Sequence, residues 1–155
     1  MILKARTHIQ ADPEEIFTFF EEMEENYEQW HDEHITFRWV EGRPLKKGSQ
    51  SYFEEEIGGE VLKKTVVYSR VIPNRRIELQ PTSRLMRLFL PRIIFDIEPG
   101  NNGCHFTQRI KIRTGPIGRR LNRDQFDAVH QHMQEEGENL KRMIETSPKS
   151  STVAE

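Results

Sequence analysis

Several residue types and patterns that mark common protein classes are scarce in this sequence. Its 155 residues contain one cysteine, Cys104, which excludes a disulfide framework and a cysteine-based zinc finger. No apolar run reaches the roughly 18 residues that a membrane-spanning helix requires, and the N-terminus lacks the apolar core of a signal peptide. There is no glycine-rich phosphate loop, no Ser–His–Asp order and no RNA-stacking motif. We therefore expect a cytoplasmic protein without membrane insertion and without a nucleic-acid partner.

An excess of charge of one sign is absent as well. The 23 lysines and arginines nearly balance the 25 aspartates and glutamates, and the formal net charge of −2 gives no overall field that favours nucleic acid or acidic membranes. Hydrophobic residues make up 35% of the chain and occur in periodic blocks, which is typical of a folded protein. We expect a single domain over residues 1–146, followed by a disordered tail over residues 147–155.

The expected elements follow the order strand, short helix, several strands and long final helix. Residues 2–10 alternate between apolar and polar side chains, as in a half-buried strand. The sequence around Pro13 then favours a helix, with Asp12 as its cap and Glu15 placed to complete a capping box. Six further runs between turn signals have strand character: 34–41, 48–57, 60–72, 75–80, 92–98 and 104–113.

The remaining segments connect these strands or follow them. Residues 24–34 are acidic and aromatic, and we interpret them as a helix end or loop. Residues 81–91 are too long for a tight turn and too apolar to lie free in water, so we expect them to cover the mouth of a barrel or cavity. The final helix spans about 122–146, with Asn122 as its cap. An α+β fold, in which a curved antiparallel sheet wraps around this helix, would bury both.

Two residues with metal-binding side chains share the inward face of the final helix. His132 and Glu136 are four residues apart, so they stack one above the other. At about 100° per residue, Glu136 falls roughly 40° and His132 roughly 80° from the centre of the apolar stripe, whereas Glu135 points almost straight out. A carboxylate aimed at a core must be protonated, paired or bound to a metal.

Two other segments offer partners for this pair. In residues 30–34, His31 and His34 precede a strand from which they could reach a cavity mouth. Glu55 lies between Phe53 and Ile57 in an alternating strand, so it should also face the core. A solvated histidine loop and a rim glutamate paired with an arginine are the alternatives.

A metal ion would explain these polar groups together. Glu55, His132 and Glu136, with either His31 or His34, form a set of two histidines and two carboxylates. Such a set suits zinc or another first-row divalent ion such as iron or manganese. Each inward acid would be costly to bury alone, but a dication offsets that cost for all of them.

The other candidate residues are weaker. His105 alternates with apolar neighbours and should face solvent. His130 lies on the opposite flank of the final helix from Glu136, where a partly buried structural role is expected. Cys104 shares a face with Phe106 and is interpreted as a small core residue.

The order of elements resembles the START/Bet v 1-like (SRPBCC) superfamily, and residues 9–17 are similar to the first strand-to-helix junction of that group. Residues 26–35, 48–55 and 132–140 resemble the 2,4-diacetylphloroglucinol hydrolase-like branch more closely. This resemblance implies a helix-grip fold with an internal cavity, and a zinc ion held by two histidines and two glutamates. It also implies cleavage of a carbon–carbon bond next to an aryl ketone.

The residues that match the ligands of this branch can be named one by one. His132 and Glu136 match its His-x-x-x-Glu pair directly. Glu55 matches the strand glutamate, with Glu54 as a register-shifted alternative. The first histidine matches either His31 or His34.

Two functions are consistent with these observations. The first is a zinc-dependent hydrolase that acts on a small, apolar, carbonyl-bearing aromatic, in which a spare carboxylate, Glu54 or Asp32, would shuttle a proton. The second is a START-like carrier of a hydrophobic ligand without catalysis. A monomer and a homodimer are both compatible with the sequence.

Overall fold

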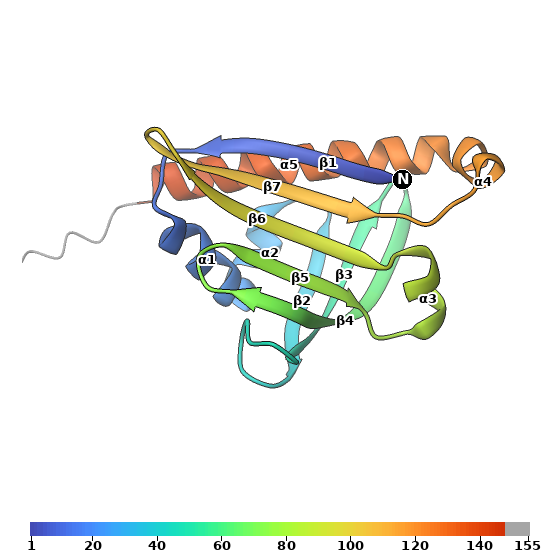
Figure 1. Cartoon of the computed structure of the whole chain (residues 1–155), viewed down its shortest axis with the longest axis horizontal. Coiled ribbons are helices and arrows are strands. Elements are labelled where there is room, and N and C mark those ends of the chain that lie inside the picture. The colour runs from blue at the N-terminus through green and yellow to red at the C-terminus, as the bar shows by residue number, and fades with distance from the viewer. Residues whose placement is uncertain (148–155) are drawn as a thin grey trace, which may run out of the picture.

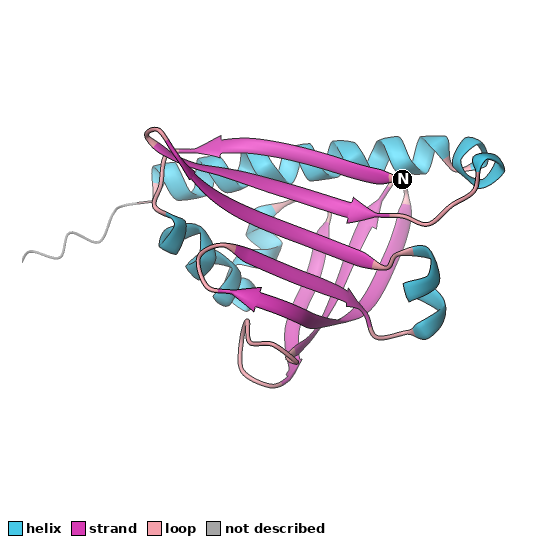
Figure 2. Cartoon of the chain, in the orientation of Figure 1, coloured by secondary structure: helices cyan, strands magenta, loops and turns pink. Residues whose placement is uncertain are grey.

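The computed structural model describes residues 1–147, and its strands form one curved antiparallel sheet (Figures 1 and 2). The predicted tail lies, apart from Ser147, outside the described residues. Among these residues seven strands pair in the order β1-β7-β6-β5-β4-β3-β2, so β1 and β2 are the edges of the sheet. The bounds are β1 (Ile2–Ile9), β2 (His34–Glu41), β3 (Gln50–Ile57), β4 (Glu60–Ile72), β5 (Arg76–Pro81), β6 (Arg92–Gly100) and β7 (Gly103–Lys111). Each begins and ends within about two residues of the predicted run, the usual uncertainty of such boundaries.

Five helices join and cover the sheet in the described part of the chain. They are α1 (Pro13–Glu21), α2 (Met23–Trp30), α3 (Arg84–Phe89), α4 (Pro116–Leu121) and α5 (Arg123–Thr146). The long helix α5 runs beside β1 along the length of the molecule (Figure 1). In the described residues, no helix combines the length and the apolar character needed to cross a bilayer.

Helix α5 approaches β1 closely because residue 137 has no side chain. A Cβ atom at Gly137 would collide with the hydroxyl of Thr7 on β1. Two hydrogen bonds hold the helix on the strand: the ring of His130 contacts the Lys4 carbonyl at 2.9 Å, and Lys141 donates to the His8 carbonyl at 3.1 Å. His130 is half-buried, and thus has the structural role that we predicted for it.

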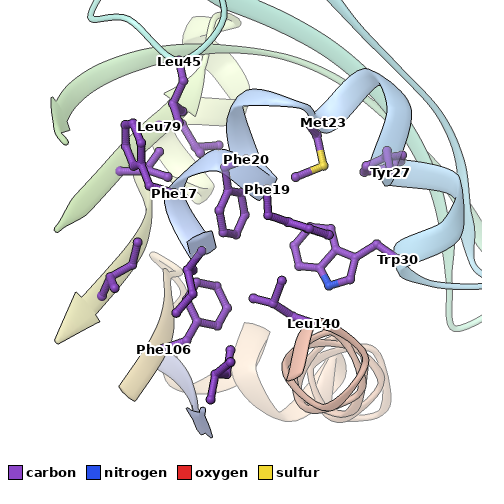
Figure 3. Packing of buried hydrophobic residues seen from close by; sticks show 14 of the residues in the cluster. Phe17, Phe19, Phe20, Met23, Tyr27, Trp30, Leu45, Leu79, Phe106 and Leu140 are labelled. Carbon is purple, nitrogen blue, oxygen red and sulfur yellow. The ribbon is translucent and has the colours of Figure 1, made fainter. Parts of the chain in front are cut away.

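The core lies between the sheet, α1, α2 and α5 (Figure 3). Phe20 of α1 stacks on Phe95 of β6, and its ring also meets Trp30 of α2 edge to face. Leu140 of α5 and Phe106 of β7 are fully buried against the same cluster. Burying aromatic side chains of this size supplies much of the free energy that fixes α1 and α2 on the sheet.

The interpretation of residues 24–34 as a helix end or loop was wrong, because most of this segment is the helix α2. Met23, Tyr27 and Trp30 recur at helical spacing and are all buried, while the acidic side chains between them face outward. Helix α1 begins at Pro13 as predicted, but Asp12 caps it only through its backbone: its carbonyl accepts from Glu15 N at 3.0 Å, and its side chain forms no cap bond.

The segments before β6 and before α5 also differ from the prediction. Residues 81–91 contain α3, whose N-terminus is capped by the hydroxyl of Ser83. Leu90, directly after α3, lines the cavity as expected, whereas Leu88 is 54% exposed and does not cover it. An additional helix, α4, precedes α5, and the Asn122 side chain donates to the Gly118 carbonyl rather than capping α5.

Candidate metal centre

Four buried side chains from three elements converge at one wall of the fold. His34 begins β2 and stands directly opposite Glu55 on β3, so both project from the same face of the sheet. His132 and Glu136 lie one turn apart on α5, and that turn faces this pair. All four residues are less than 9% exposed.

The donor atoms of these four side chains lie within 4.8 Å of one another. Glu136 Oε1 is 2.8 Å from Nε2 of His34 and 2.8 Å from Nε2 of His132, and the two Nε2 atoms are 3.3 Å apart. Glu55 Oε2 lies 3.4 Å from Nε2 of His132 and 4.0 Å from Nε2 of His34. Two imidazole nitrogens and two carboxylates are therefore directed at one small volume.

The far side of each imidazole ring is held by an acceptor. Nδ1 of His34 donates to the Tyr27 carbonyl at 2.8 Å, and Nδ1 of His132 contacts Glu33 Oε1 at 3.2 Å. The ring of Tyr27 also stacks on that of His34, with 3.9 Å between centroids. A histidine that donates through Nδ1 presents the lone pair of Nε2 when the ring is neutral. Both rings are thus oriented as metal ligands usually are.

His31 and His34, which the sequence left as alternatives, have opposite hydrogen-bonding patterns. Nδ1 of His31 accepts from the backbone N–H of Glu33 at 2.9 Å, and its Nε2 contacts Glu135 Oε2 at 2.6 Å. A neutral His31 therefore carries its proton on Nε2 and donates it to Glu135. His34, Glu55, His132 and Glu136 form an inner group, whereas His31 lies in a second, outer group with Glu33 and His132.

The charges of the inner group stabilise one another. Burial by itself would lower the pKa of His132, but its contacts with Glu136 and Glu55 outweigh burial and raise this pKa to about 11. Burial would raise the pKa of Glu136, but its close contacts with His132 and His34 outweigh burial and lower this pKa to about 2. Without a cation, a proton on His132 therefore offsets the buried carboxylates.

Burial, followed by the charges of Glu55 and Glu136, raises the pKa of the Tyr27 phenol above its ordinary value. This phenol consequently stays protonated at neutral pH and remains a hydrogen-bond donor.

Glu54 and Asp32, the proposed proton carriers, do not join the inner group. Glu54 lies on the opposite face of β3 from Glu55, because side chains alternate along a strand, and it accepts a 2.5 Å hydrogen bond from Tyr52. Asp32 is exposed in the turn before β2. In the turn before β2, it is instead Glu33 whose carboxylate contacts a histidine of the inner group, His132.

Two further side chains at this site were not predicted, Lys64 and Glu135. Lys64 Nζ lies 3.7 Å from Glu55 Oε1, and its side chain is only 14% exposed. The sequence pattern could have predicted the inward position of Lys64, because Lys64 lies between Leu62 and Val66 in an alternating strand, as Glu55 lies between Phe53 and Ile57. Glu135 points away from the core as predicted, but it still reaches His31 because that histidine lies at the rim of the group.

The inner group borders a cavity of about 320 Å³ between the sheet and α5. Glu55, Lys64, His132 and Glu136 form a polar part of its wall. Most of the remaining wall is apolar or aromatic, and it includes Phe20, Met23, Trp30, Phe37, Phe53, Phe95 and Met133. Such a space suits a small hydrophobic molecule that carries one or two polar atoms.

The likeness of this chain to known proteins lies in the fold. No family model matches the sequence, and no curated protein matches it. The KanY protein (ms6282) superposes with a TM-score of 0.75 at 13% identity, over 94% of this chain and 97% of that one. Ara h 8.0201 superposes with a TM-score of 0.65 at 10% identity, over 93% of this chain and 97% of that one. The Polyketide_cyc-like protein Cgl2372 from Corynebacterium glutamicum superposes with a TM-score of 0.59 at 14% identity, over 99% of this chain and 97% of that one.

These neighbours and the observed topology define the class of structure. The chain has an α+β helix-grip fold, which it shares with Ara h 8.0201 and with the Polyketide_cyc-like protein Cgl2372, and this confirms the predicted fold class. The resemblance to the 2,4-diacetylphloroglucinol hydrolase-like branch stays a prediction, because one fold supports many activities and a particular activity has to be inferred from the residues of the site.

Proposed function

We propose that this protein binds a first-row divalent cation, zinc being the first candidate, through His34, Glu55, His132 and Glu136. The observation that carries the proposal is the convergence of two Nε2 atoms and two carboxylates within 4.8 Å, while both Nδ1 atoms are held by acceptors behind the rings. This donor set suits zinc, iron or manganese. A dication would replace the proton on His132 as the charge that offsets Glu55 and Glu136.

We infer that the function is hydrolysis of a small, apolar, carbonyl-bearing aromatic. Zinc, when bound, supplies a Lewis acid that polarises a carbonyl group and lowers the pKa of water. The residues of the chain would position the substrate, because Phe20, Phe53 and Trp30 offer aromatic surfaces to its ring. The Lys64 ammonium would bind a carbonyl or phenolic oxygen of the substrate beside Glu55.

The bond to be broken is suggested by the resemblance of residues 26–35, 48–55 and 132–140 to the 2,4-diacetylphloroglucinol hydrolase-like branch. It supports cleavage of the carbon–carbon bond between an aromatic ring and its acyl group. Water supplies the hydroxyl of the released carboxylic acid and the hydrogen that replaces the acyl group on the ring. Glu54 and Asp32 have no proton-transfer role in this proposal, because both lie away from the inner group. Glu33 instead positions His132.

Metal content and turnover of matched variants test this proposal. The purified protein should hold about one zinc, iron or manganese per chain by elemental mass spectrometry. The variants His132→Ala and Glu136→Gln should lose the metal and acetate release from acylated phloroglucinols together. His130→Ala is the matched control, because His130 is on the same helix but contacts the Lys4 carbonyl instead of the inner group. Metal-loaded protein that turns over no acylated aromatic would contradict the hydrolase.

A carrier of hydrophobic ligands is the second candidate, and the largely apolar cavity wall favours it. A carrier would bind an aromatic ligand equally well with and without metal and would release it unchanged. Trp30 offers a direct readout, because its ring lines the cavity and its indole N–H donates to the Glu136 carbonyl at 2.9 Å. Unchanged quenching of Trp30 fluorescence after chelation, together with no turnover, would favour the carrier.

A further inference from the structure

The basic residues are strongly segregated along the chain. Residues 82–92 and 111–123 together contain eight of the 23 lysines and arginines and no aspartate or glutamate. The rest of the chain consequently has 15 basic residues against 25 acidic ones. Conversely, residues 12–28 contain eight acidic residues and no lysine or arginine. The small net charge of the whole chain conceals this separation.

The fold turns this segregation in sequence into a separation in space. Helices α3 and α4 lie at one end of the long axis of the molecule, whereas α1 lies at the other (Figure 1). The two basic segments are joined where Arg113 N donates to the Phe89 carbonyl at 2.8 Å. One surface hollow beside α3 is bordered by Arg84, Arg87, Arg92, Lys111 and Arg113. The protein therefore has a basic end and an acidic end, so an anionic surface would attract and orient it.

The basic end also exposes large apolar side chains. Five of the nine most exposed ones in the described part of the chain belong to α3 and α4. They are Leu85 at 66%, Leu88 at 54%, Phe89 at 61%, Ile117 at 76% and Leu121 at 80% exposure. Single exposed apolar residues are ordinary, but five of them among arginines on two helices at the same end make this end of the molecule both cationic and apolar.

This surface adjoins the cavity. Leu90 directly follows α3 and Ile112 directly follows β7, and both side chains line the cavity wall. The segments that bear the basic and apolar side chains therefore also border the space where a hydrophobic ligand would be held.

We propose that this end of the molecule, formed by α3, α4 and residues 111–115, docks peripherally on an anionic phospholipid bilayer. The arginines and Lys111 contact the lipid phosphates, and the exposed side chains of α3 and α4 enter the boundary between headgroups and acyl chains. Charge complementarity favours an anionic surface as the partner. The exposed apolar side chains favour a bilayer over a nucleic acid, because a phosphate backbone provides no apolar environment in which they could be buried. Neither helix spans the bilayer. This inference does not depend on the proposed metal or on hydrolysis.

Co-sedimentation of the full chain with lipid vesicles tests the docking. Vesicles of phosphatidylcholine with about 30% phosphatidylglycerol should sediment the protein at low salt, and vesicles of phosphatidylcholine alone should not. Raising the salt from about 0.05 M to about 0.5 M should weaken the binding, because screening shortens the reach of the charges.

Two comparisons between variants locate the surface. R119E/R120E should weaken partition by at least about 20-fold, because each basic residue near the surface contributes roughly a fivefold factor. The control K46E/K47E changes the net charge equally but lies in the exposed loop between β2 and β3, and it should leave binding unchanged. L88S/I117S should weaken binding to the same vesicles, whereas V40S on β2 should not. Circular dichroism should be unchanged in all four, since all the substituted side chains are exposed.

The proposal is overturned if anionic vesicles do not sediment the protein at low salt, or if R119E/R120E and K46E/K47E have equal effects. It is also overturned if the basic end binds a soluble polyanion such as heparin or RNA while vesicles remain unbound. Loss of zinc or of turnover without loss of vesicle binding would contradict the proposed function and leave the docking intact.

Discussion

One carboxylate oxygen of Glu136, Oε1, lies 2.8 Å from Nε2 of His34 and 2.8 Å from Nε2 of His132. Its own backbone carbonyl accepts from the indole of Trp30 at 2.9 Å. One helical residue thus joins the edge strand β2, the helix α5 and the helix α2. Because the carboxylate is buried, its removal has a larger effect than the loss of a surface ion pair.

The two histidines that precede the sheet should differ sharply in their contribution to metal binding. His34→Ala should lower zinc affinity by at least about 100-fold, because it removes an imidazole whose Nε2 faces the inner group. His31→Ala should lower it by less than about tenfold, because the Nε2 of this ring is committed to Glu135. Competition titration with a chromophoric chelator measures both. Equal losses would show that the two rings are interchangeable, contrary to their hydrogen bonding.

Glu33→Gln should weaken metal binding without abolishing it. Glu33 Oε1 contacts Nδ1 of His132 at 3.2 Å, and supporting acceptors of this kind contribute about 10- to 100-fold in affinity. Asp32→Asn is the matched control in the same turn, because Asp32 is exposed. Both variants should unfold at nearly the same urea concentration as the parent. If Asp32→Asn has the larger effect on affinity, Glu33 does not position His132.

The stability of the metal-free protein should fall at both ends of the pH range. The pKa of His132 is raised to about 11, so its contribution is complete below the ordinary value of 6.5 and is lost as the pH rises toward 11. The pKa of Glu136 is lowered to about 2, so its contribution is complete above 4.5 and is lost as the pH falls toward 2. Urea unfolding in the presence of a chelator, from pH 3 to pH 10, measures the loss of stability at low and at high pH. His132→Gln should reduce the loss at high pH. An unchanged loss at high pH in that variant would show that another group causes it.

Metal binding should strengthen as the pH rises. The cation competes with the proton that His132 carries in the metal-free state, so each step toward alkaline pH lowers the cost of displacing that proton. Calorimetric titration of the chelated protein in buffers of different ionisation enthalpy should register the released proton. Affinity that is constant from pH 6 to pH 9 would mean that His132 is not a ligand.

Substitutions at neighbouring positions of α5 separate the buried and exposed acids. Glu136→Gln should destabilise the metal-free protein by about 3–5 kcal/mol, because it removes the buried negative charge that faces the protonated His132. Glu135→Gln should cost about 0–1 kcal/mol, since the side chain of Glu135 is 42% exposed and its ion pair with His31 is screened by water. Chemical denaturation under identical chelating conditions compares them. Similar losses would place Glu136 in contact with solvent.

The close approach of α5 to β1 predicts a penalty for a single added methyl group. Gly137→Ala should destabilise the protein by about 1–3 kcal/mol, because the new Cβ collides with the Thr7 hydroxyl. Gly115→Ala is the control, since a Cβ there meets nothing within 4 Å. Adding Thr7→Ala to Gly137→Ala should restore part of the loss. Thermal unfolding of these three variants and of Thr7→Ala alone tests the contact, and an additive double variant would contradict it.

The strands and the long helix could be predicted because their apolar periods differ and are regular. Alternation placed Glu55 inward, and helical spacing placed His132 and Glu136 on the inward face of α5, so three members of the inner group follow from local pattern alone. The fourth could not be chosen by sequence. His31 contacts the Glu33 N–H and the Glu135 carboxylate, whereas His34 contacts the Tyr27 carbonyl and the Glu136 carboxylate. These contacts are set by the turn between α2 and β2 and by its position against α5, and neither can be read from the local sequence.

Helix α2 was missed because acidic residues dominate its composition and conceal its three buried positions. The segment is helical because the helix buries Tyr27 and Trp30 against the rest of the protein, and this burial outweighs the polarity of the other residues. The basic end was missed for a different reason. A net charge is an average over the chain, and residues 82–92 and 111–123 come together only when β6 and β7 pair.

The position of β2 at the edge of the sheet has a consequence for the motions of this protein. The inner group links the edge pair of β2 and β3 to α5 through contacts between side chains. When the charges of the inner group are unbalanced, these two strands should be the first part of the sheet to separate from α5. Solvent and proteases would then reach this edge before the rest of the sheet unfolds. The occupant of the inner group would then control how long the cavity stays shut, and hence the residence time of a molecule inside it.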